Sequence, residues 1–212
     1  MARIICIMGE SGAGKTTAMR NLDPETTLYI DADGKGLAWK DWRKQYNTDK
    51  KNYIATNDDV KIKKWMDSVN VNGKHIKTLV VDTLNGIMVA EEMRRMKDKG
   101  YDKWISLAVC VWDMVNDALF YRDDLTVIFI CHSETDRDDN GYMFTRVKTS
   151  GKKLDKIVLE SKFPTVLLAK KIDDRYVFET TANNSTAKSP MGALEPIEDN
   201  DIVKILEKME GY

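Results

Sequence analysis

Residues 3–16 read RIICIMGESGAGKT, and the fold depends on this stretch. An apolar run from Arg3 to Met8 comes first, which is typical of a strand buried on both faces of a parallel sheet. The next residues, Gly9 to Thr16, match the pattern Gly-x-x-x-x-Gly-Lys-Thr in full. A helical pattern follows through about Asn21. A strand, a glycine-rich loop and a helix in this order predict an α/β domain.

The residue types in this loop suit phosphate binding. Glycines let the backbone curl so that several N–H groups point at one anion, and the following helix presents its positive end to the same anion. Lys15 is expected to reach the β- and γ-phosphates of a nucleoside triphosphate, and the Thr16 hydroxyl to bind Mg²⁺. The predicted nucleotide-binding residues are Gly9, Glu10, Ser11, Gly12, Ala13, Gly14, Lys15, Thr16 and Thr17.

Strand and helix patterns alternate along the rest of the chain. Further strands are predicted at 28–30, 53–55, 78–82, 125–131 and 142–147. Further helices are predicted at 37–46, 58–70, 83–99, 101–121, 152–161 and 201–209. Residues 165–170 and 176–180 are expected to form a C-terminal β-hairpin, and the polar stretch 133–141 an exposed turn or mobile loop. We expect a single domain, residues 1–212, with a mostly parallel sheet and helices on both faces.

Composition limits the classes of protein. The 212 residues are enough to bury a core, and 42% hydrophobic with 32% charged residues is typical of a globular chain. The net charge of -1 means that a polyanionic partner would need a local basic patch. Cys6, Cys110 and Cys131 lack a metal-ligand spacing and are expected to be free thiols. No run approaches the ~20 apolar residues of a membrane span, so we expect a cytoplasmic protein.

Acidic residues end two of the predicted strands. Asp82 follows the apolar run Leu79-Val80-Val81, where a Walker B aspartate holds Mg²⁺ beside the phosphate loop. Asp31 and Asp33 end an earlier strand, and strand ends on one edge of a parallel sheet meet at the nucleotide. Hydrolysis needs a carboxylate that orients the attacking water. One of these two acids is the candidate, and the alternative is a turn acid before Gly34.

A histidine ends another predicted strand. His132 follows the apolar run 127–131, and a polar side chain there would point at the γ-phosphate and sense hydrolysis. The alternative is that His132 only caps the strand. His75, in a polar turn, is expected to be solvated.

Basic and aromatic residues gather after His132. Cations with nearby aromatic rings are typical of a groove for single-stranded DNA, where charge meets the backbone and rings stack on bases. Several acids lie in the same stretch, so a solvated surface of mixed charge is the alternative. The basic residues are Arg137, Arg146, Lys148, Lys152, Lys153, Lys156 and Lys162, and the aromatic residues are Tyr142, Phe144 and Phe163.

The ordered set of motifs resembles the RecA-like recombinase ATPases. It is more similar to the small phage-encoded P-loop ATPases related to them, which are associated with single-strand annealing and recombination. The likeness rests on the phosphate loop and on strand ends near Asp33, Asp82 and His132. Shorter segments of likeness to the phage group lie at 101–104, 149–154 and 187–190.

This resemblance implies roles for individual residues. Asp33 falls where RecA-like proteins place a water-activating glutamate, and it is one methylene shorter. His132 falls at the place of a γ-phosphate-sensing glutamine, and the stretch after it at that of a mobile DNA-binding loop. Lys188 falls near basic residues that some RecA-like proteins insert into a neighbour's ATP site. The candidate catalytic residues are therefore Lys15, Asp33, Asp82, His132 and Lys188.

The function that the resemblance implies is a Mg²⁺-dependent ATPase that acts on single-stranded DNA in phage recombination or replication, as a homo-oligomer. ATP is favoured over other nucleotides by resemblance alone. One alternative is a nucleotide switch or loader that binds a phage replication protein. Another is a small-molecule kinase, but the lid candidate, residues 133–141, has one arginine among several acids, which argues against it.

Overall fold

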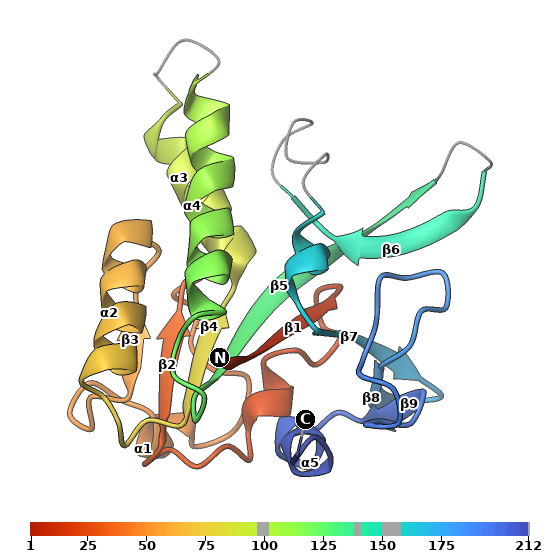
Figure 1. The fold of residues 1–212 in the computed structure, drawn as a ribbon, viewed down its shortest axis with the longest axis horizontal. Coiled ribbons are helices and arrows are strands. Elements are labelled where there is room, and N and C mark those ends of the chain that lie inside the picture. Colours follow the sequence, from red (N-terminus) through yellow and green to blue (C-terminus); the bar gives the residue numbers. More distant parts are fainter. Residues whose placement is uncertain (97–101, 138–140, 150–157, 212) are drawn as a thin grey trace.

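The computed structural model describes residues 1–96, 102–137, 141–149 and 158–211. Within these residues a nine-stranded sheet has the order β3-β2-β4-β5-β1-β7-β8-β9, and β6 pairs with β5 (Figure 1). The strands are β1 (Arg3–Gly9), β2 (Thr27–Asp31), β3 (Tyr53–Ala55), β4 (Thr78–Asp82), β5 (Thr126–Arg137), β6 (Met143–Val147), β7 (Thr165–Ile172), β8 (Arg175–Glu179) and β9 (Ile197–Asp199).

The central strands run parallel, and their register brings the candidate site together. β1 pairs in parallel with β5 and β7, while β4 pairs in parallel with β2 and β5. Gly9 lies opposite His132, and Asp82 lies opposite both Asp31 and Ile130. The carboxyl ends of β1, β2 and β4 therefore meet beside the middle of β5, at one edge of the sheet. Strands β7 to β9 pair antiparallel, so the predicted α/β class with a C-terminal hairpin is confirmed.

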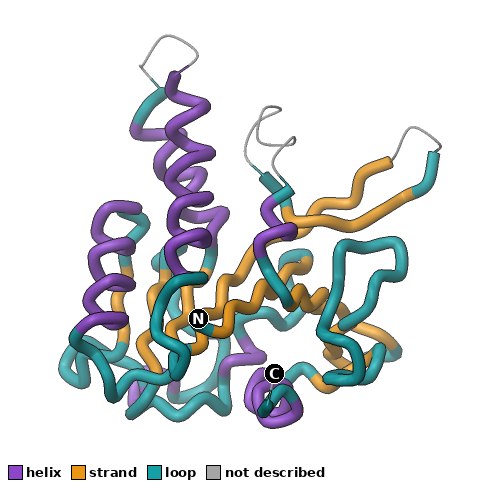
Figure 2. The backbone as a smooth tube through the Cα atoms, viewed as in Figure 1, coloured by secondary structure: helices purple, strands orange, loops and turns teal. Residues whose placement is uncertain are grey.

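Helices cover both faces of the sheet (Figures 1 and 2). One face packs against α2 (Asp59–Val71), α3 (Leu84–Arg94) and α4 (Asp102–Ala118). The other face packs against shorter elements, namely η1 (Thr17–Met19), α1 (Trp42–Gln45) and α5 (Ile202–Lys208). A fourth short element, η3 (Leu159–Lys162), precedes β7. No described helix has both the length and the apolar character needed to cross a bilayer.

Side chains in β1 alternate between the two cores. Ile4 and Cys6 belong to the larger core, while Ile5 and Ile7 belong to the smaller one. A strand that buries both faces must be apolar throughout, which is why the run before the phosphate loop is so uniform. Cys6 is a buried free thiol, as expected.

The helix expected after the phosphate loop is much shorter than predicted. Instead of a helix through Asn21, the chain forms only the single 3-10 turn of η1. Pro24 disfavours a helical backbone at the residue before it, and β2 must begin at Thr27. Hydrogen bonds from the Ala18 amide to the Gly14 carbonyl and from the Leu22 amide to the Met19 carbonyl extend the turn on both sides, so the length of the predicted helix is wrong and its role toward a phosphate stays a prediction. The helix predicted over residues 37–46 is likewise reduced, to α1.

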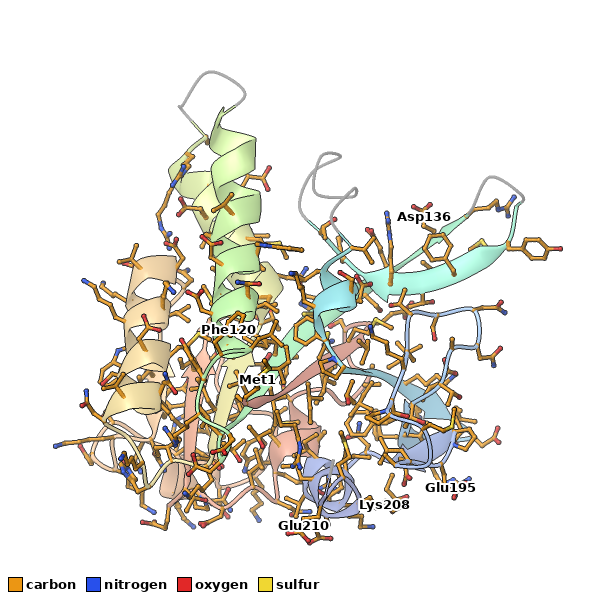
Figure 3. The ribbon with its side chains drawn as sticks, in the orientation of Figure 1. Met1, Phe120, Asp136, Glu195, Lys208 and Glu210 are labelled. Atoms are coloured by element: carbon orange, nitrogen blue, oxygen red, sulfur yellow. The ribbon has the colours of Figure 1, made fainter. Side chains whose placement is uncertain are left out.

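The stretch predicted as a loop after His132 is partly a strand. β5 continues to Arg137 and pairs antiparallel with β6, so the two form a hairpin that projects from the sheet (Figures 1 and 3). Arg146 on β6 pairs with Glu134 at 3.1 Å and with Asp136 at 3.2 Å on β5. These cross-strand ion pairs stabilise the hairpin. Its strands lack the alternation of apolar and polar residues from which a hairpin can be predicted.

One residue predicted to contact DNA, Phe163, instead belongs to the core, and a second, Lys162, is half-buried against a helix. Phe163 is only 1% exposed, and its ring packs edge-on against Phe129 with centroids 5.7 Å apart. The Lys162 ammonium lies 4.3 Å from the ring centre of Trp112. Burial therefore rules out Phe163 as a base-stacking residue. The other basic candidates at 152, 153 and 156 lie outside the described residues.

Replacing Phe163 tests this reassignment. Phe163→Ala should lower the free energy of unfolding by about 3–5 kcal/mol, because it removes a large side chain from a packed core. Tyr142→Ala, at a side chain that is 71% exposed, should change it by less than about 0.5 kcal/mol. Denaturant unfolding measures both values. A Phe163→Ala protein as stable as wild type would contradict the assignment.

Candidate nucleotide-binding site

The phosphate loop needs glycine at three positions, for two geometric reasons. Gly12 and Gly14 have φ of +80° and +88°, in the left-handed region that other residues rarely adopt. A Cβ on Gly9 would lie 2.6 Å from the carbonyl oxygen of Ala169 on β7. The loop can therefore curl tightly over the end of β1 only with glycine at these positions.

Lys15 points into the loop rather than out to solvent. Its Nζ donates hydrogen bonds to the carbonyl oxygens of Gly9, at 2.9 Å, and Glu10, at 2.7 Å. Burial lowers the pKa of Lys15, and the nearby Asp82 carboxylate acts in the opposite direction. The ammonium is thus held at the centre of the loop, where a phosphate oxygen can replace a carbonyl as its partner.

Thr16 and Asp82 meet across the sheet edge, as the sequence predicts for a metal site. The Thr16 hydroxyl donates to Oδ2 of Asp82 at 2.7 Å, and the Tyr29 hydroxyl donates to the same oxygen at 2.7 Å. Asp82 is 2% exposed, and its Oδ1 is buried with no hydrogen-bond partner among the described residues. Burial raises the pKa of Asp82, while the hydrogen bonds from both hydroxyls lower it.

These groups fit Mg²⁺. Mg²⁺ is usually held by one or two carboxylates together with phosphate oxygens and its own waters, rather than by a cage of protein ligands. Among the residues with described side chains, no cluster of three or more His, Cys, Asp or Glu residues could hold a metal ion. The single carboxylate of Asp82, with an oxygen that lacks a partner, and the Thr16 hydroxyl match an ion that arrives with a triphosphate and offsets its charge.

Asp31 is fully occupied in holding a turn. Its Oδ1 accepts a hydrogen bond from the Gly34 amide at 2.8 Å. Its Oδ2 accepts from the Gly36 amide at 2.8 Å and from the Tyr53 hydroxyl at 2.7 Å. A buried carboxylate with three donors in place is a structural group, and it has little capacity left for water.

Asp33 instead faces a cavity at the edge of the sheet. Its Oδ1 accepts from the Thr83 hydroxyl at 3.1 Å, and its Oδ2 pairs with Lys35 Nζ at 2.6 Å. A Cβ on Gly86 would lie 2.2 Å from Oδ1, so only glycine lets α3 approach this carboxylate. Asp33 and His132 both line this cavity of about 380 Å³. The geometry thus favours Asp33 over Asp31 as the carboxylate that can orient water.

His132 lies beside the phosphate loop, opposite Gly9 in the pairing of β1 with β5. Its backbone amide donates to Oδ1 of Asn85 at 2.7 Å, and its carbonyl accepts from the Lys148 amide at 2.8 Å. Burial lowers the pKa of His132, and the positive charge of Lys15 lowers it further. The imidazole is therefore neutral at pH 7, with one ring N–H to donate and one nitrogen to accept.

Two residues of the site, Asn85 and Tyr29, were not predicted from the sequence. Asn85 is buried in the first turn of α3, and its Nδ2 donates to the carbonyl of Lys148 at 2.8 Å, so that one side chain joins α3 to both strands of the hairpin. Its only signal is its place three residues after Asp82. Tyr29 gave no signal, because an aromatic residue inside an apolar strand pattern is expected to be core.

Lys188 lies away from the phosphate loop of its own chain. Its amide and carbonyl pair with Val166 of β7 at 2.9 and 2.8 Å. Val166 is level with Cys6 in the neighbouring β1, three residues before Gly9. This segment is therefore held against β7, away from the candidate site. The predicted role of Lys188 in the ATP site of a neighbouring subunit remains a proposal.

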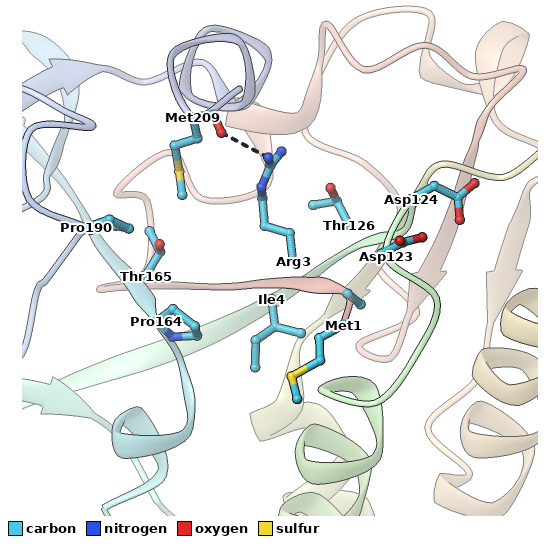
Figure 4. A pocket seen from close by; sticks show the side chains of 11 residues that line it. Met1, Arg3, Ile4, Asp123, Asp124, Thr126, Pro164, Thr165, Pro190 and Met209 are labelled. Carbon is cyan, nitrogen blue, oxygen red and sulfur yellow. Dashed lines mark hydrogen bonds between the residues drawn. The ribbon is translucent and has the colours of Figure 1, made fainter. Parts of the chain in front are cut away.

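A second cavity lies at the opposite edge of the sheet (Figure 4). It has a volume of about 460 Å³ and surrounds the amino end of β1. The Arg3 guanidinium donates to the carbonyl of Met209 at 2.9 Å there, which ties β1 to the end of α5. Its lining lacks a glycine-rich loop, so the nucleotide is expected at the carboxyl edge.

Matched substitutions separate the two acids at the end of β2. Asp33→Asn should lower the rate of ATP hydrolysis by 10²-fold or more while ATP affinity changes little, because positioned acid–base groups contribute about 10²–10⁴-fold. Asp31→Asn should instead lower the free energy of unfolding, since an amide cannot accept from all three donors without a clash. Single-turnover rates and thermal unfolding of both variants check this. The reverse pattern would mean that Asp31 is the carboxylate that orients water.

The charge state of His132 can be measured directly. An NMR titration of its ring should give a pKa below the ordinary value of 6.5, because burial and Lys15 both disfavour the cation. In Lys15→Met the pKa should rise part of the way back, since burial and the charges of Lys35 and Lys148 continue to lower it. A His132 pKa that does not respond to Lys15→Met would show that the two groups do not face each other.

Comparison with known proteins agrees with this geometry. The AAA domain family matches residues 1–190. A KaiC-like protein from the hyperthermophilic archaeon Pyrococcus horikoshii OT3 is 15% identical, and the alignment covers 83% of this chain and 76% of that chain with a TM-score of 0.45. No curated protein matches the chain. With the family match over most of its length, the chain belongs to the AAA domain family.

Proposed function

We propose that this protein is a Mg²⁺-dependent ATPase whose turnover responds to single-stranded DNA. The observation that carries the proposal is the arrangement at one edge of the sheet, where Lys15 and the Thr16–Asp82 pair lie at the phosphate loop and Asp33 and His132 line the neighbouring cavity. A phosphate-binding loop alone would support binding only. A partly exposed carboxylate and a neutral imidazole on the same cavity add the groups that hydrolysis needs.

Each residue has a defined task in this proposal. The loop amides and Lys15 bind the β- and γ-phosphates and stabilise the charge that builds up on them. Asp33 accepts a hydrogen bond from the attacking water and orients it, and the Thr83 hydroxyl holds Asp33 in place. The ring N–H of His132 donates to a γ-phosphate oxygen. Asp82 and Thr16 keep the metal ion on the phosphates.

The hairpin of β5 and β6 is the proposed DNA contact. It begins at His132, and exposed side chains of Arg137, Tyr142 and Lys148 lie along it. Charge and an exposed aromatic ring suit a single strand, which needs no sequence readout. Arg146 contributes less charge, because it is paired with two carboxylates. The proposed setting, phage recombination or replication, and the completion of a neighbouring subunit's site by Lys188 rest on the resemblance.

A second candidate is a nucleotide switch or loader that binds a replication protein. The observation that favours it is an exposed apolar stripe on and just after α3, formed by Val89, Met93 and Met96. Their spacing places them on one side of the helix, and exposed apolar groups of this kind mark protein contacts. α3 also begins directly after Asp82 and Thr83, so a partner bound there would contact the element nearest the metal site.

The proposal is tested by ATP hydrolysis measured without DNA, with single-stranded DNA and with double-stranded DNA. We expect single-stranded DNA to raise the rate more than double-stranded DNA does, and Lys15→Ala to remove activity in all three. A wild-type protein that binds ATP but never hydrolyses it would favour the switch or loader. A matched pair of double variants then tests the hairpin.

The first double variant, Arg137→Ala with Tyr142→Ala, removes one exposed cation and one exposed ring from the hairpin. The second, Lys64→Ala with Phe120→Ala, also removes one exposed cation and one exposed aromatic ring, but from the helical side of the molecule. Only the first should lose DNA stimulation, and its DNA affinity should fall less steeply with salt, by about 0.7 log units per log unit of salt for one lost phosphate contact. Equal behaviour of the two variants would exclude the hairpin as the DNA contact.

A further inference from the structure

Tyr29 is a core residue with a polar contact at the candidate metal site. It lies in the middle of β2, is fully buried and faces the smaller of the two cores. Its hydroxyl nevertheless donates to Oδ2 of Asp82, on the neighbouring β4, at 2.7 Å. A buried tyrosine hydroxyl needs a partner, but a backbone carbonyl would serve as well as this carboxylate.

The two oxygens of Asp82 have different surroundings as a result. Oδ2 accepts from both Tyr29 and Thr16, while Oδ1 is buried and has no hydrogen-bond partner among the described residues. With both donors on one oxygen, the carboxylate cannot rotate without breaking two hydrogen bonds. The other oxygen is therefore held in a fixed direction.

The ring of Tyr29 is itself fixed by aromatic neighbours. It packs edge-on against Tyr46, with centroids 5.8 Å apart, and against Trp39, at 6.5 Å. Trp39 is anchored in turn, because its Nε1 donates to Oε1 of Gln45 at 2.8 Å. The Tyr29 hydroxyl is thus supported by packing and does not depend on any ligand for its position.

Thr16 and Tyr29 differ in what they can do when the site is in use. Under the proposed function the Thr16 hydroxyl would bind Mg²⁺ through an oxygen lone pair, so its position would depend on the ion, whereas Tyr29 has no contact with the ion to make. Resting on that function, we propose that Tyr29 is a positioning residue that holds Oδ2 of Asp82, so that the carboxylate keeps one orientation beside Thr16, where it would hold the water shell of Mg²⁺. Groups that orient a metal ligand in this way commonly contribute 10–100-fold to metal affinity.

Tyr46 provides a matched control. It is fully buried in the same aromatic cluster, and its hydroxyl donates to the carbonyl of Leu22 at 3.3 Å. Tyr29→Phe and Tyr46→Phe therefore remove the same hydroxyl from the same cluster. They differ in whether the lost partner is Asp82 or a backbone carbonyl.

The experiment is calorimetric titration of ATP into wild type, Tyr29→Phe and Tyr46→Phe, once with excess Mg²⁺ and once with EDTA. We expect Tyr29→Phe to lower the ratio of the ATP affinity in Mg²⁺ to the ATP affinity in EDTA by about tenfold, because the variant loses only the contribution of the metal ion to ATP binding. Tyr46→Phe should keep the wild-type ratio. In addition, Tyr29→Phe should change the ratio little in an Asp82→Asn background, because the two residues act through one contact.

The outcomes separate this inference from the function on which it rests. An unchanged ratio in Tyr29→Phe, or equal losses in Mg²⁺ and EDTA, would overturn the positioning role while ATP binding by wild type upholds the nucleotide site. Equal changes in Tyr29→Phe and Tyr46→Phe would also overturn it. If Tyr29→Phe does not fold, Trp39→Phe serves in its place, because it keeps the Tyr29 hydroxyl and removes the anchored ring beside it. A wild type that fails to bind ATP in both buffers would overturn the nucleotide site and this inference together.

Discussion

The hydrogen bond between the Thr16 hydroxyl and the Asp82 carboxylate joins two strands that are not neighbours in the sheet. β5 lies between β1 and β4, so the contact exists only because the phosphate loop bends back over β5. That bend needs glycine conformations in the loop, and it needs β1 and β4 to end at nearly the same level along β5, where Gly9 lies opposite His132 and Asp82 opposite Ile130. The register of the buried strands, set by apolar packing on both faces, is therefore the condition for bringing the phosphate-binding and metal-binding groups together.

The three acidic residues near the loop differ in how many hydrogen-bond and ion-pair partners their carboxylates have. Asp31 is saturated with donors, and Asp33 is partly exposed and paired with Lys35. Asp82 is buried with one oxygen lacking a partner, which carries a penalty on the order of 1–3 kcal/mol for an unsatisfied group. Such a penalty is relieved by protonation, which the raised pKa favours, or by a ligand that supplies a donor or a metal-bound water. The acid that is least satisfied is thus the one placed to gain most from a bound ion.

The sequence predicted the strands up to β8 (β5 only as far as residue 131), the phosphate loop and the strand-end acids, because each rests on a local pattern, but it did not predict β9. It did not predict the hairpin of β5 and β6, whose pairing depends on contacts such as Arg146 with Glu134 rather than on apolar alternation. It did not separate Asp31 from Asp33, because the turn that saturates Asp31 is completed by Tyr53, from another strand. Tyr29 was hidden for the same reason. A buried tyrosine looks like packing until a neighbouring strand brings a carboxylate to its hydroxyl.

The contact of Lys15 with the carbonyls of Gly9 and Glu10 has a kinetic consequence. These oxygens compete with phosphate oxygens for one ammonium, so the loop contains its own intramolecular competitor. Measured affinity is then the difference between two sets of hydrogen bonds, and it is weaker than the phosphate contacts alone would give. The same two carbonyls can accept from Lys15 as a diphosphate leaves. The buried ammonium therefore keeps hydrogen-bond partners throughout release. Lower affinity and faster exchange therefore have a common origin in this loop.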